Sequence, residues 1–131
     1  MHGAGAALGD AAADTVTDLS TLSVSGTTAI NTSNVTSTGA QTYTGAVTLG
    51  TDTTLTGSTI TTQDVVVGAG KSLTLTGNAV LGNGASDTVT GLSSLAISGQ
   101  TTLGTGTVTS TGTQTYGGAL TLAENTTLTG S

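Results

Sequence analysis

The sequence predicts an all-β fold, a single-stranded β-helix (β-solenoid) with coils of about 18–24 residues. Three observations lead to this prediction: the second half of the chain repeats the first, Thr is abundant while Pro is absent, and short stretches of alternating apolar and polar residues end at Gly. A repeated unit of this kind cannot bury its apolar face alone, so copies stack and enclose a shared core.

An internal repeat covers most of the chain. Residues 14–58 align with residues 87–131 without a gap, and about two thirds of the paired residues are identical, including the words "VTSTG", "QTY" and "TTLTGS". We expect one β-solenoid domain over residues 14–131, in which residues 59–86 form connecting coils. Residues 1–13 are rich in Ala and Gly, and we interpret them as a tail, or as a cap formed by a short helix over residues 4–13 that covers the first rung.

Composition favours strands over a compact sphere or a disordered chain. Only 34% of the residues are hydrophobic, 2% aromatic and 6% charged, which is a thin supply for a globular core. Disordered chains are rich in charge and Pro, whereas this chain has no Pro and is rich in β-branched Thr. An immunoglobulin-like β-sandwich is the second fold candidate, although its core usually needs large aromatic residues and this chain has no Trp or Phe.

Short stretches in which apolar and polar residues alternate mark the expected strands, and Gly marks the expected corners. The apolar pairs of these stretches are Leu22 and Val24, Val47 and Leu49, Leu73 and Leu75, Leu95 and Ile97, and Leu120 and Leu122. Such alternation predicts strands with one buried face. Corners are expected where Gly follows an apolar residue and Ser or Thr, at Gly26, Gly57, Gly77, Gly99 and Gly130.

Coil length follows from neighbouring repeat words. The word "TLTG" begins at Thr54 and again at Thr74, which predicts a coil of about 20 residues. We also expect the long offset of 73 residues between the two repeats to hold a whole number of coils. Four coils near 18 residues and three near 24 both satisfy that expectation, so stacking partners stay open.

Charge and hydropathy exclude several function classes. The only basic side chain is Lys71 and the formal net charge is −6, which excludes binding to nucleic-acid phosphates. The longest apolar run, Val65 to Val67, is too short to span a membrane, and no signal peptide is visible. We expect the chain to be a segment of a longer protein whose export signal lies elsewhere. Cys is absent, so no disulfide framework is predicted.

Two long words carry a family resemblance. "TSTGAQTYTGAVTLGTDTTLTGS" from Thr36 and "TSTGTQTYGGALTLAENTTLTGS" from Thr109 resemble the Thr- and Gly-rich repeats of filamentous-haemagglutinin-type β-strand-repeat bacterial surface adhesins. The resemblance implies a right-handed β-helix, export across the outer membrane of a Gram-negative cell, and service as a stalk or adhesive fibre. It implies no shared catalytic residues.

The titratable residues predict no active site, metal site or cofactor. Asp14 and Asp87 are repeat copies of each other, and Asp52 and Glu124 fall one position out of register, so we interpret these acids as turn residues. His2 has no partner for a metal or for a nucleophile. The calcium-binding nonapeptide of RTX solenoids has only a loose echo in "GNGASD", residues 82–87.

The two tyrosines are the only candidate binding residues. Tyr43 and Tyr116 occupy the same repeat position, which would place two rings on one face for weak glycan contact. The alternative interpretation is a repeated packing or corner residue. The words "TLT" and "TVT" are similar to the flat Thr arrays of ice-binding solenoids, but they fall at irregular intervals along the chain.

We therefore expect a non-enzymatic structural or adhesive segment of a large secreted or surface-anchored bacterial adhesin, acting as a rigid stalk with repeated contact faces. Its expected partners are host-cell or matrix surfaces or glycans, without nucleic acid and without membrane insertion. The alternative is a subunit of an extracellular fibre that self-associates end to end by strand pairing. A carbohydrate-binding module and an ice-binding solenoid are minor alternatives.

Overall fold

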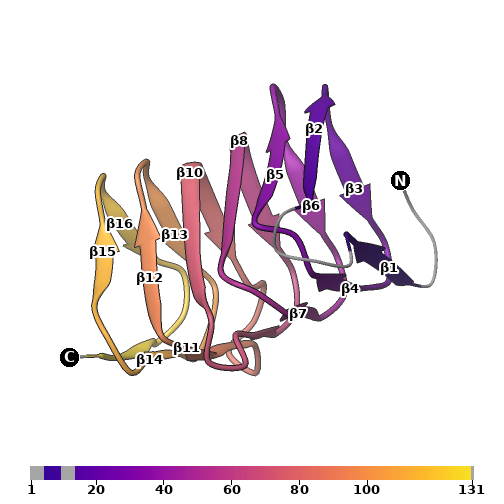
Figure 1. Cartoon of the computed structure of the whole chain (residues 1–131). Coiled ribbons are helices and arrows are strands. Elements are labelled where there is room, and N and C mark those ends of the chain that lie inside the picture. The colour runs from indigo at the N-terminus through magenta and orange to yellow at the C-terminus, as the bar shows by residue number, and fades with distance from the viewer. Residues whose placement is uncertain (1–4, 10–13, 131) are drawn as a thin grey trace.

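The chain winds into a β-solenoid (Figure 1). The computed structural model describes residues 5–9 and 14–130, over which the chain forms strands, turns and bends but no helix. The strands are β1 (Gly5–Leu8), β2 (Thr15–Leu19), β3 (Leu22–Val24), β4 (Thr27–Ile30), β5 (Asn34–Ser37), β6 (Gln41–Tyr43), β7 (Val47–Leu49), β8 (Thr53–Thr62), β9 (Val66–Val67), β10 (Ser72–Leu81), β11 (Thr88–Leu92), β12 (Ser94–Ile97), β13 (Thr101–Leu103), β14 (Thr107–Ser110), β15 (Gln114–Tyr116), β16 (Leu120–Leu122) and β17 (Thr127–Thr129). Every strand pair among them is parallel, which confirms the predicted solenoid and excludes the sandwich.

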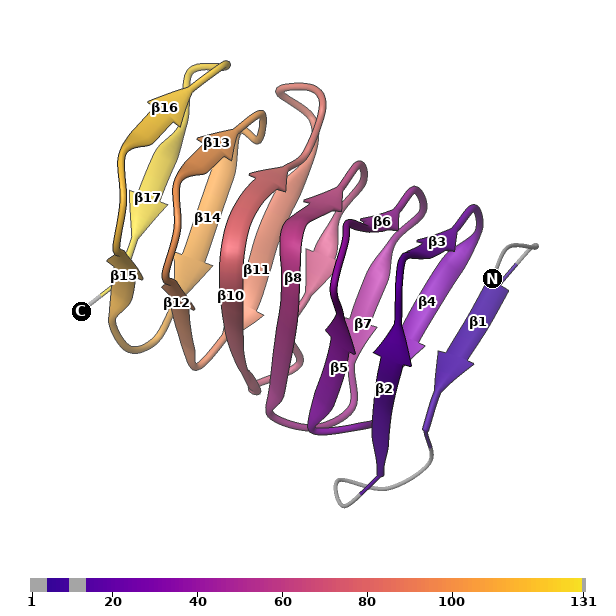
Figure 2. The same cartoon turned by 90° about the horizontal axis from the view of Figure 1, so that it is seen from above.

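Each coil contributes one strand to each of three sides (Figure 2). Face 1 is the seven-stranded sheet β1-β4-β7-β9-β11-β14-β17. Face 2 holds β2, β5, β12, β15 and the first halves of β8 and β10, and face 3 holds β3, β6, β13, β16 and their second halves. The long strands β8 and β10 run through the corner between faces 2 and 3. Because face 1 has seven strands, the chain makes about six turns between β1 and β17.

The register confirms the predicted coil length. Thr54 pairs with Thr74, twenty residues on, as the two "TLTG" words indicate. Most other coils are of similar length, since Val47 pairs with Val66 nineteen residues later. One coil is longer because it contains the loop of residues 82–87, and there Ser72 pairs with Ser94.

Alternating residues of each strand point into a narrow lumen. The apolar pairs expected to face inward, among them Leu73 and Leu75, are buried along most of the solenoid. Stacked partners form continuous rows, and the row on face 2 consists of Val16, Val35, Leu55, Leu75, Ile97 and Tyr116. Small branched side chains fill a space of this width, so the fold needs few aromatic residues.

A ladder of glycines forms the corner between faces 2 and 3. Its members are Gly39, Gly57, Gly77, Gly99 and Gly118. The backbones of successive members touch, and the amide nitrogens of Gly99 and Gly118 lie 3.0 Å from the carbonyl oxygens of Gly77 and Gly99, to which they donate. A Cβ on Gly99 would lie 2.6 Å from the oxygen of Gly77, which is too close for any other residue. Gly is therefore required here for close approach of the coils.

The two long repeats do not lie on the same sides of the solenoid, so the expectation of a whole number of coils was wrong. Residues in β2 on face 2 correspond to β11 on face 1, and those in β6 on face 3 correspond to β15 on face 2. From β2 to β11 the chain passes eleven sides, which is three full turns and two further sides. The second repeat is thus rotated by one side relative to the first. Consistently, the corner words end at different corners: Gly26 stacks with Gly45, Gly57 with Gly77, and Gly130 with Gly112.

The start of the chain is a strand where it is described. Gly5–Leu8 forms β1, which pairs in parallel with β4 and covers its edge. The short helix considered for residues 4–13 is therefore wrong over these four residues, while residues 4 and 10–13 lie outside the described part of the chain. No helix long and apolar enough to cross a membrane occurs among the described residues.

Replacing Gly77 by Ala tests the corner ladder. Gly77 has a φ of +128°, and its added Cβ would overlap the carbonyl oxygen of Gly57. We expect Gly77→Ala to lower the free energy of unfolding by about 2–4 kcal/mol in urea titrations. Gly84→Ala is the matched control, since a Cβ there meets no atom within 4 Å, and it should change stability by about 0.5 kcal/mol or less. Equal losses in both variants would contradict the crowding explanation.

Candidate functional site

The word "QTY" forms the same hydrogen-bond cluster in both repeats. In β6 the Tyr43 hydroxyl donates to Gln41 Oε1 at 2.7 Å, while Gln41 Nε2 donates to the carbonyl oxygens of Val35 at 3.1 Å and Thr56 at 2.8 Å. Val35 lies in the preceding strand of the same coil and Thr56 in the next coil. The amide of Gln41 therefore links two coils from inside the lumen.

The second cluster repeats these contacts on another face. In β15 the Tyr116 hydroxyl donates to Gln114 Oε1 at 2.7 Å, and Gln114 Nε2 donates to the carbonyl oxygens of Val108 at 3.2 Å and Thr129 at 2.8 Å. Each partner lies 73 residues after its counterpart in the first repeat. The residues of "QTY" therefore form the same hydrogen-bond network on face 3 in the first repeat and on face 2 in the second.

The tyrosines do not form one aromatic platform. Tyr43 is fully buried (0% exposed) on face 3, whereas Tyr116 is only half-buried on face 2, where β15 pairs with β12 alone among the described strands. The prediction that both rings share a face is therefore wrong, and the packing interpretation describes Tyr43. Contact with a glycan stays a prediction, for which Tyr116 is the ring with exposed surface.

Burial affects the ionisation of both rings. Desolvation raises the pKa of Tyr43 well above the ordinary value of 10.0, and desolvation also raises the pKa of Tyr116. The charged phenolate is the form that burial disfavours. Both hydroxyls therefore stay protonated donors to their Gln partners at neutral pH.

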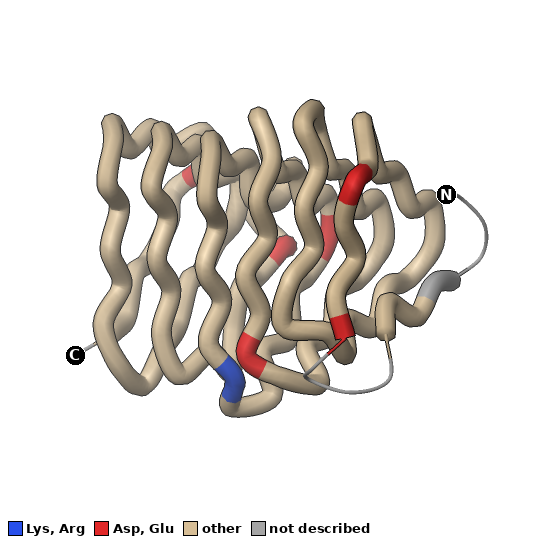
Figure 3. The backbone as a smooth tube through the Cα atoms, turned by 45° about the horizontal axis from the view of Figure 1, so that its top comes forward, with Lys and Arg blue, Asp and Glu red and all other residues tan. Residues whose placement is uncertain are grey.

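Three of the acids, Asp52, Asp64 and Asp87, accept hydrogen bonds from backbone amides at corners and loops. Asp52 accepts a hydrogen bond from the amide of Ser72 in the next coil at 2.9 Å, and the Asp87 carboxylate accepts one from the amide of Asn83 at 2.8 Å. Asp64 accepts from the amide that follows it. These contacts fit the predicted turn role. Figure 3 shows the acids scattered over the solenoid, and no group of three or more possible metal ligands gathers within residues 5–9 and 14–130. His2 lies outside the described residues.

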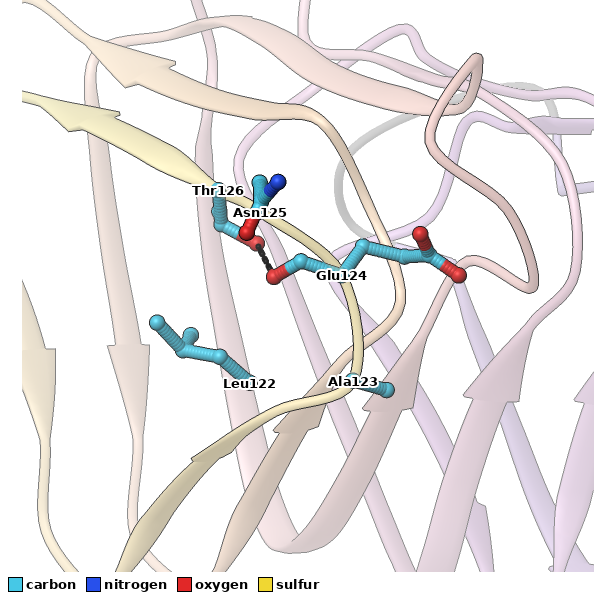
Figure 4. Close-up of a pocket in the computed structure, with 5 residues that line it drawn as sticks. All are labelled: Leu122, Ala123, Glu124, Asn125 and Thr126. Atoms are coloured by element: carbon cyan, nitrogen blue, oxygen red, sulfur yellow. Dashed lines mark hydrogen bonds between the residues drawn. The ribbon is translucent and has the colours of Figure 1, made fainter.

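An open hollow lies in the loop between β16 and β17 (Figure 4). It is lined by Leu122, Ala123, Glu124, Asn125 and Thr126. The Thr126 hydroxyl donates to the carbonyl oxygens of Thr105 at 2.7 Å and Glu124 at 3.1 Å, which fixes the loop. Glu124 is the one titratable side chain of this lining, and the figure shows it extending away from Leu122. The hollow brings no acid and base together.

The last three strands of face 1, β11, β14 and β17, carry a short outward array of Thr. Thr88 pairs with Thr107, and Thr107 with Thr127, so the "TVT" and "TLT" words stack in register. The other words, at residues 15–17, 54–56 and 74–76, lie on face 2, so the intervals along the chain are irregular because the words occupy two faces.

The last rung of the solenoid, β15 to β17, presents lumen residues to solvent. Among large hydrophobic side chains in the described part of the chain, the exposed ones are Leu120, Leu122 and Leu128 in this rung and Val67 on face 1. Leu120 and Leu122 stack on the buried side of β13, at Thr101 and Leu103. They end rows that are covered everywhere else.

These features define a parallel β-solenoid repeat protein. Comparisons with protein-family models, with curated proteins and with solved structures found no match. The resemblance to filamentous-haemagglutinin-type adhesins and the right-handed winding that it implies therefore stay predictions.

The burial of Tyr43 should make the free energy of unfolding fall at alkaline pH. An unfolded tyrosine ionises near its ordinary pKa of 10.0, while folded Tyr43 keeps its proton. The unfolded state then binds fewer protons, so stability is complete below pH 10 and falls above it by up to about 1.4 kcal/mol per pH unit. We expect Tyr43→Phe to remove most of this slope and Tyr116→Phe to remove less, measured as urea unfolding free energies from about pH 8 to about pH 11. An unchanged slope in Tyr43→Phe would refute the assignment.

Proposed function

We propose that the chain is a non-enzymatic spacer segment of a large secreted or surface-anchored bacterial adhesin, in which it forms a stiff stalk. The observation that carries the proposal is the unbroken strand pairing of face 1, from β1 to β17. The adhesin setting and the extracellular location are supported by the resemblance of the two long words. The acids are scattered, and Asp52, Asp64 and Asp87 are each engaged by a backbone amide, which supports a role without catalysis.

Stiffness follows from pairing on all three sides. Each inner coil is hydrogen-bonded to the coil before it and to the coil after it, so bending would have to break several backbone hydrogen bonds together. At a strand spacing of about 4.8 Å, six turns span about 29 Å. A solenoid of this kind gains a fixed length with each added coil and resists bending.

Contacts with a partner surface would be distributed around the stalk. Thr42 on face 3 corresponds to Thr115 on face 2, because the second repeat is rotated by one side. Equivalent residues of successive repeats therefore do not face the same way. We propose that adhesion to host-cell or matrix surfaces or glycans comes from many weak contacts, so the chain alone should bind weakly.

A pair of spin labels tests the stalk. Ser23 and Thr121 point outward at the two ends of one row on face 3, and the parent chain has no Cys. Labels on Ser23→Cys/Thr121→Cys should show one narrow distance distribution near the backbone separation of five rungs, about 24 Å. A broad or multimodal distribution from the folded chain would contradict a stiff spacer.

Glycan arrays and host-cell binding assays test the absence of a dedicated ligand site. We expect no saturable binding by the isolated chain and measurable binding only when many copies are displayed on a bead. Saturable binding of one glycan by the single chain, lost in Tyr116→Ala, would instead make it a carbohydrate-binding module.

The stacked Thr words favour ice binding as a second candidate function. On the last three strands of face 1, the hydroxyl and methyl groups of Thr88, Thr107 and Thr127 stack one rung, about 4.8 Å, apart. A regular array of this chemistry can order a layer of water.

Thermal hysteresis measurements test this candidate. We expect the chain at millimolar concentration to shape ice crystals and Thr107→Lys to abolish the effect, since the long cation disrupts the array. Thr42→Lys on face 3 is the matched control and should keep it. Absence of ice shaping by the parent chain would eliminate this function.

A further inference from the structure

The loop of residues 82–87, "GNGASD", connects β10 to β11 and makes its coil longer than the neighbouring ones (Figure 2). It contains Asn83 followed by Gly84, the only place in the sequence where Gly follows Asn or Asp. Asn83 is exposed, and a Cβ on Gly84 would meet no atom within 4 Å. Because Gly carries no side chain to shield its backbone nitrogen, that nitrogen can reach the side-chain amide of the residue before it. The pair is therefore a candidate site of spontaneous deamidation.

Deamidation at this pair needs water and no other reactant. The backbone nitrogen of Gly84 bonds to Asn83 Cγ, the bond from Cγ to Nδ2 breaks, and Nδ2 leaves as ammonia with the proton of the Gly84 amide. The product is a succinimide ring. Water then opens this ring at either carbonyl, which leaves Asp, or isoaspartate with an additional methylene in the main chain. Both products carry a carboxylate in place of the uncharged amide.

The fold holds the two reacting groups through opposite neighbours. The backbone nitrogen of Gly84 donates to the carbonyl oxygen of Gly104 in the following coil at 2.8 Å. Oriented with its nitrogen toward the oxygens around it, the Asn83 amide donates to the carbonyl oxygen of Gln63 in the preceding coil at 3.0 Å and to Asp87 Oδ2 at 2.9 Å. Ring closure therefore requires the loop to give up contacts with both adjacent coils.

Asp87 fastens the loop from its inner side. Its side chain is buried, and Oδ2 also accepts a hydrogen bond from the backbone nitrogen of Asn83 at 2.8 Å. The backbone nitrogen of Asp87 donates to the carbonyl oxygen of Gly84 at 3.1 Å, and its carbonyl oxygen accepts from the backbone nitrogen of Gly106 at 2.9 Å. One carboxylate thus binds both the backbone and the side chain of Asn83.

The product of deamidation cannot restore these contacts. An ionised carboxylate at position 83 has no hydrogen to donate, and the groups that faced the Asn83 amide, Gln63 O and Asp87 Oδ2, are acceptors. Two carboxylates at this separation also repel each other. Each deamidation event should therefore weaken the contact between this loop and the neighbouring coils permanently.

We propose that Asn83 is a self-modifying site, which deamidates when the coil pairing around the loop of residues 82–87 opens and whose product prevents the loop from closing again. The site turns a transient local opening into a lasting chemical change. This goes beyond the proposed spacer function and depends only on the contacts of this loop.

Rates of deamidation in the folded and unfolded chain test the restraint. In mildly alkaline buffer, peptide mass spectrometry follows the replacement of the Asn83 amide by a hydroxyl, and isoaspartyl methyltransferase labels the isoaspartate. We expect the folded chain to react at least about tenfold more slowly than the chain in urea. Gly84→Ala should slow the reaction in urea by about tenfold, since its Cβ shields the attacking nitrogen.

Replacing Asp87 by Ala tests the fastening of the loop. This change removes the acceptor of both hydrogen bonds from Asn83 and should speed deamidation in the folded chain by about tenfold or more. Asp52→Ala is the matched control, because Asp52 also accepts from a backbone amide, that of Ser72 in the next coil at 2.9 Å, but at another corner. It should leave the rate at Asn83 unchanged. Circular dichroism checks that both variants keep their strands.

A variant that carries the product tests its effect on the loop. We expect Asn83→Asp to speed hydrogen exchange of the Gly84 amide by about tenfold or more, measured by NMR. Asn78→Asp is the matched control, because Asn78 Oδ1 accepts from the backbone nitrogen of Gln100 at 3.0 Å and a carboxylate can accept in the same way. This control should leave the exchange rate unchanged.

Three results would overturn the proposal. The first is deamidation at equal rates in the folded chain and in urea, and the second is equal rates in Asp87→Ala and Asp52→Ala. The third is a Gly84 amide that exchanges as slowly in Asn83→Asp as in the parent chain.

Discussion

Backbone pairing between successive coils is the constraint on which the rest of the structure depends. Parallel strands sit about 4.8 Å apart, so every coil must follow the path of its neighbour on all three faces. This requirement admits only Gly at the corner where Gly57, Gly77 and Gly99 stack. It also keeps the lumen narrow, so that Val, Leu and Ile fill it without Trp or Phe. A chain that is only 34% hydrophobic can form a stable structure in this way because the ladder supplies cohesion that a larger core supplies elsewhere.

The three faces are nearly equivalent, and this explains how one sequence repeat can serve two different sides. Each face takes one short strand with inward residues at alternate positions, followed by a corner. Hydrogen bonds inside a word travel with it: the Ser37 hydroxyl donates to the carbonyl oxygen of Gly39 after face 2, and Ser110 does the same to Gly112 after face 1, both at 2.8 Å. The structural unit is therefore a third of a turn, whereas the sequence repeat is three turns and two thirds.

Much of the fold could be predicted from residue patterns, because the physical rules involved are local. The alternation of Leu73 and Leu75 identifies an inward face, and the spacing of Thr54 and Thr74 gives the coil. The phase of the repeat could not be predicted, since it depends on how many corners lie between the copies and not on their distance in residues. Thr adds a second ambiguity, because Thr101 is buried in the lumen with an unpaired hydroxyl, whereas Thr88 on face 1 points outward.

The candidate site was harder to predict because exposure depends on stacking. Tyr43 and Tyr116 stand in the same word "QTY" and donate to equivalent Gln residues, yet one is covered by β8 and the other lies in the last described rung. Whether a tyrosine ring is exposed to a ligand therefore depends on the position of its coil in the stack and not on the neighbouring residues in the sequence.

The rotation of the second repeat has a consequence for how such proteins change in length. Because the words of the repeat occupy one side of the solenoid in the first copy and another side in the second, a duplication or deletion need not span whole turns to preserve the lumen. Gene segments that encode a strand and a corner can be gained or lost while the neighbouring coils keep their backbone partners. The rod can therefore lengthen in small genetic steps, and each step turns the downstream surface about the axis and presents it in a new direction.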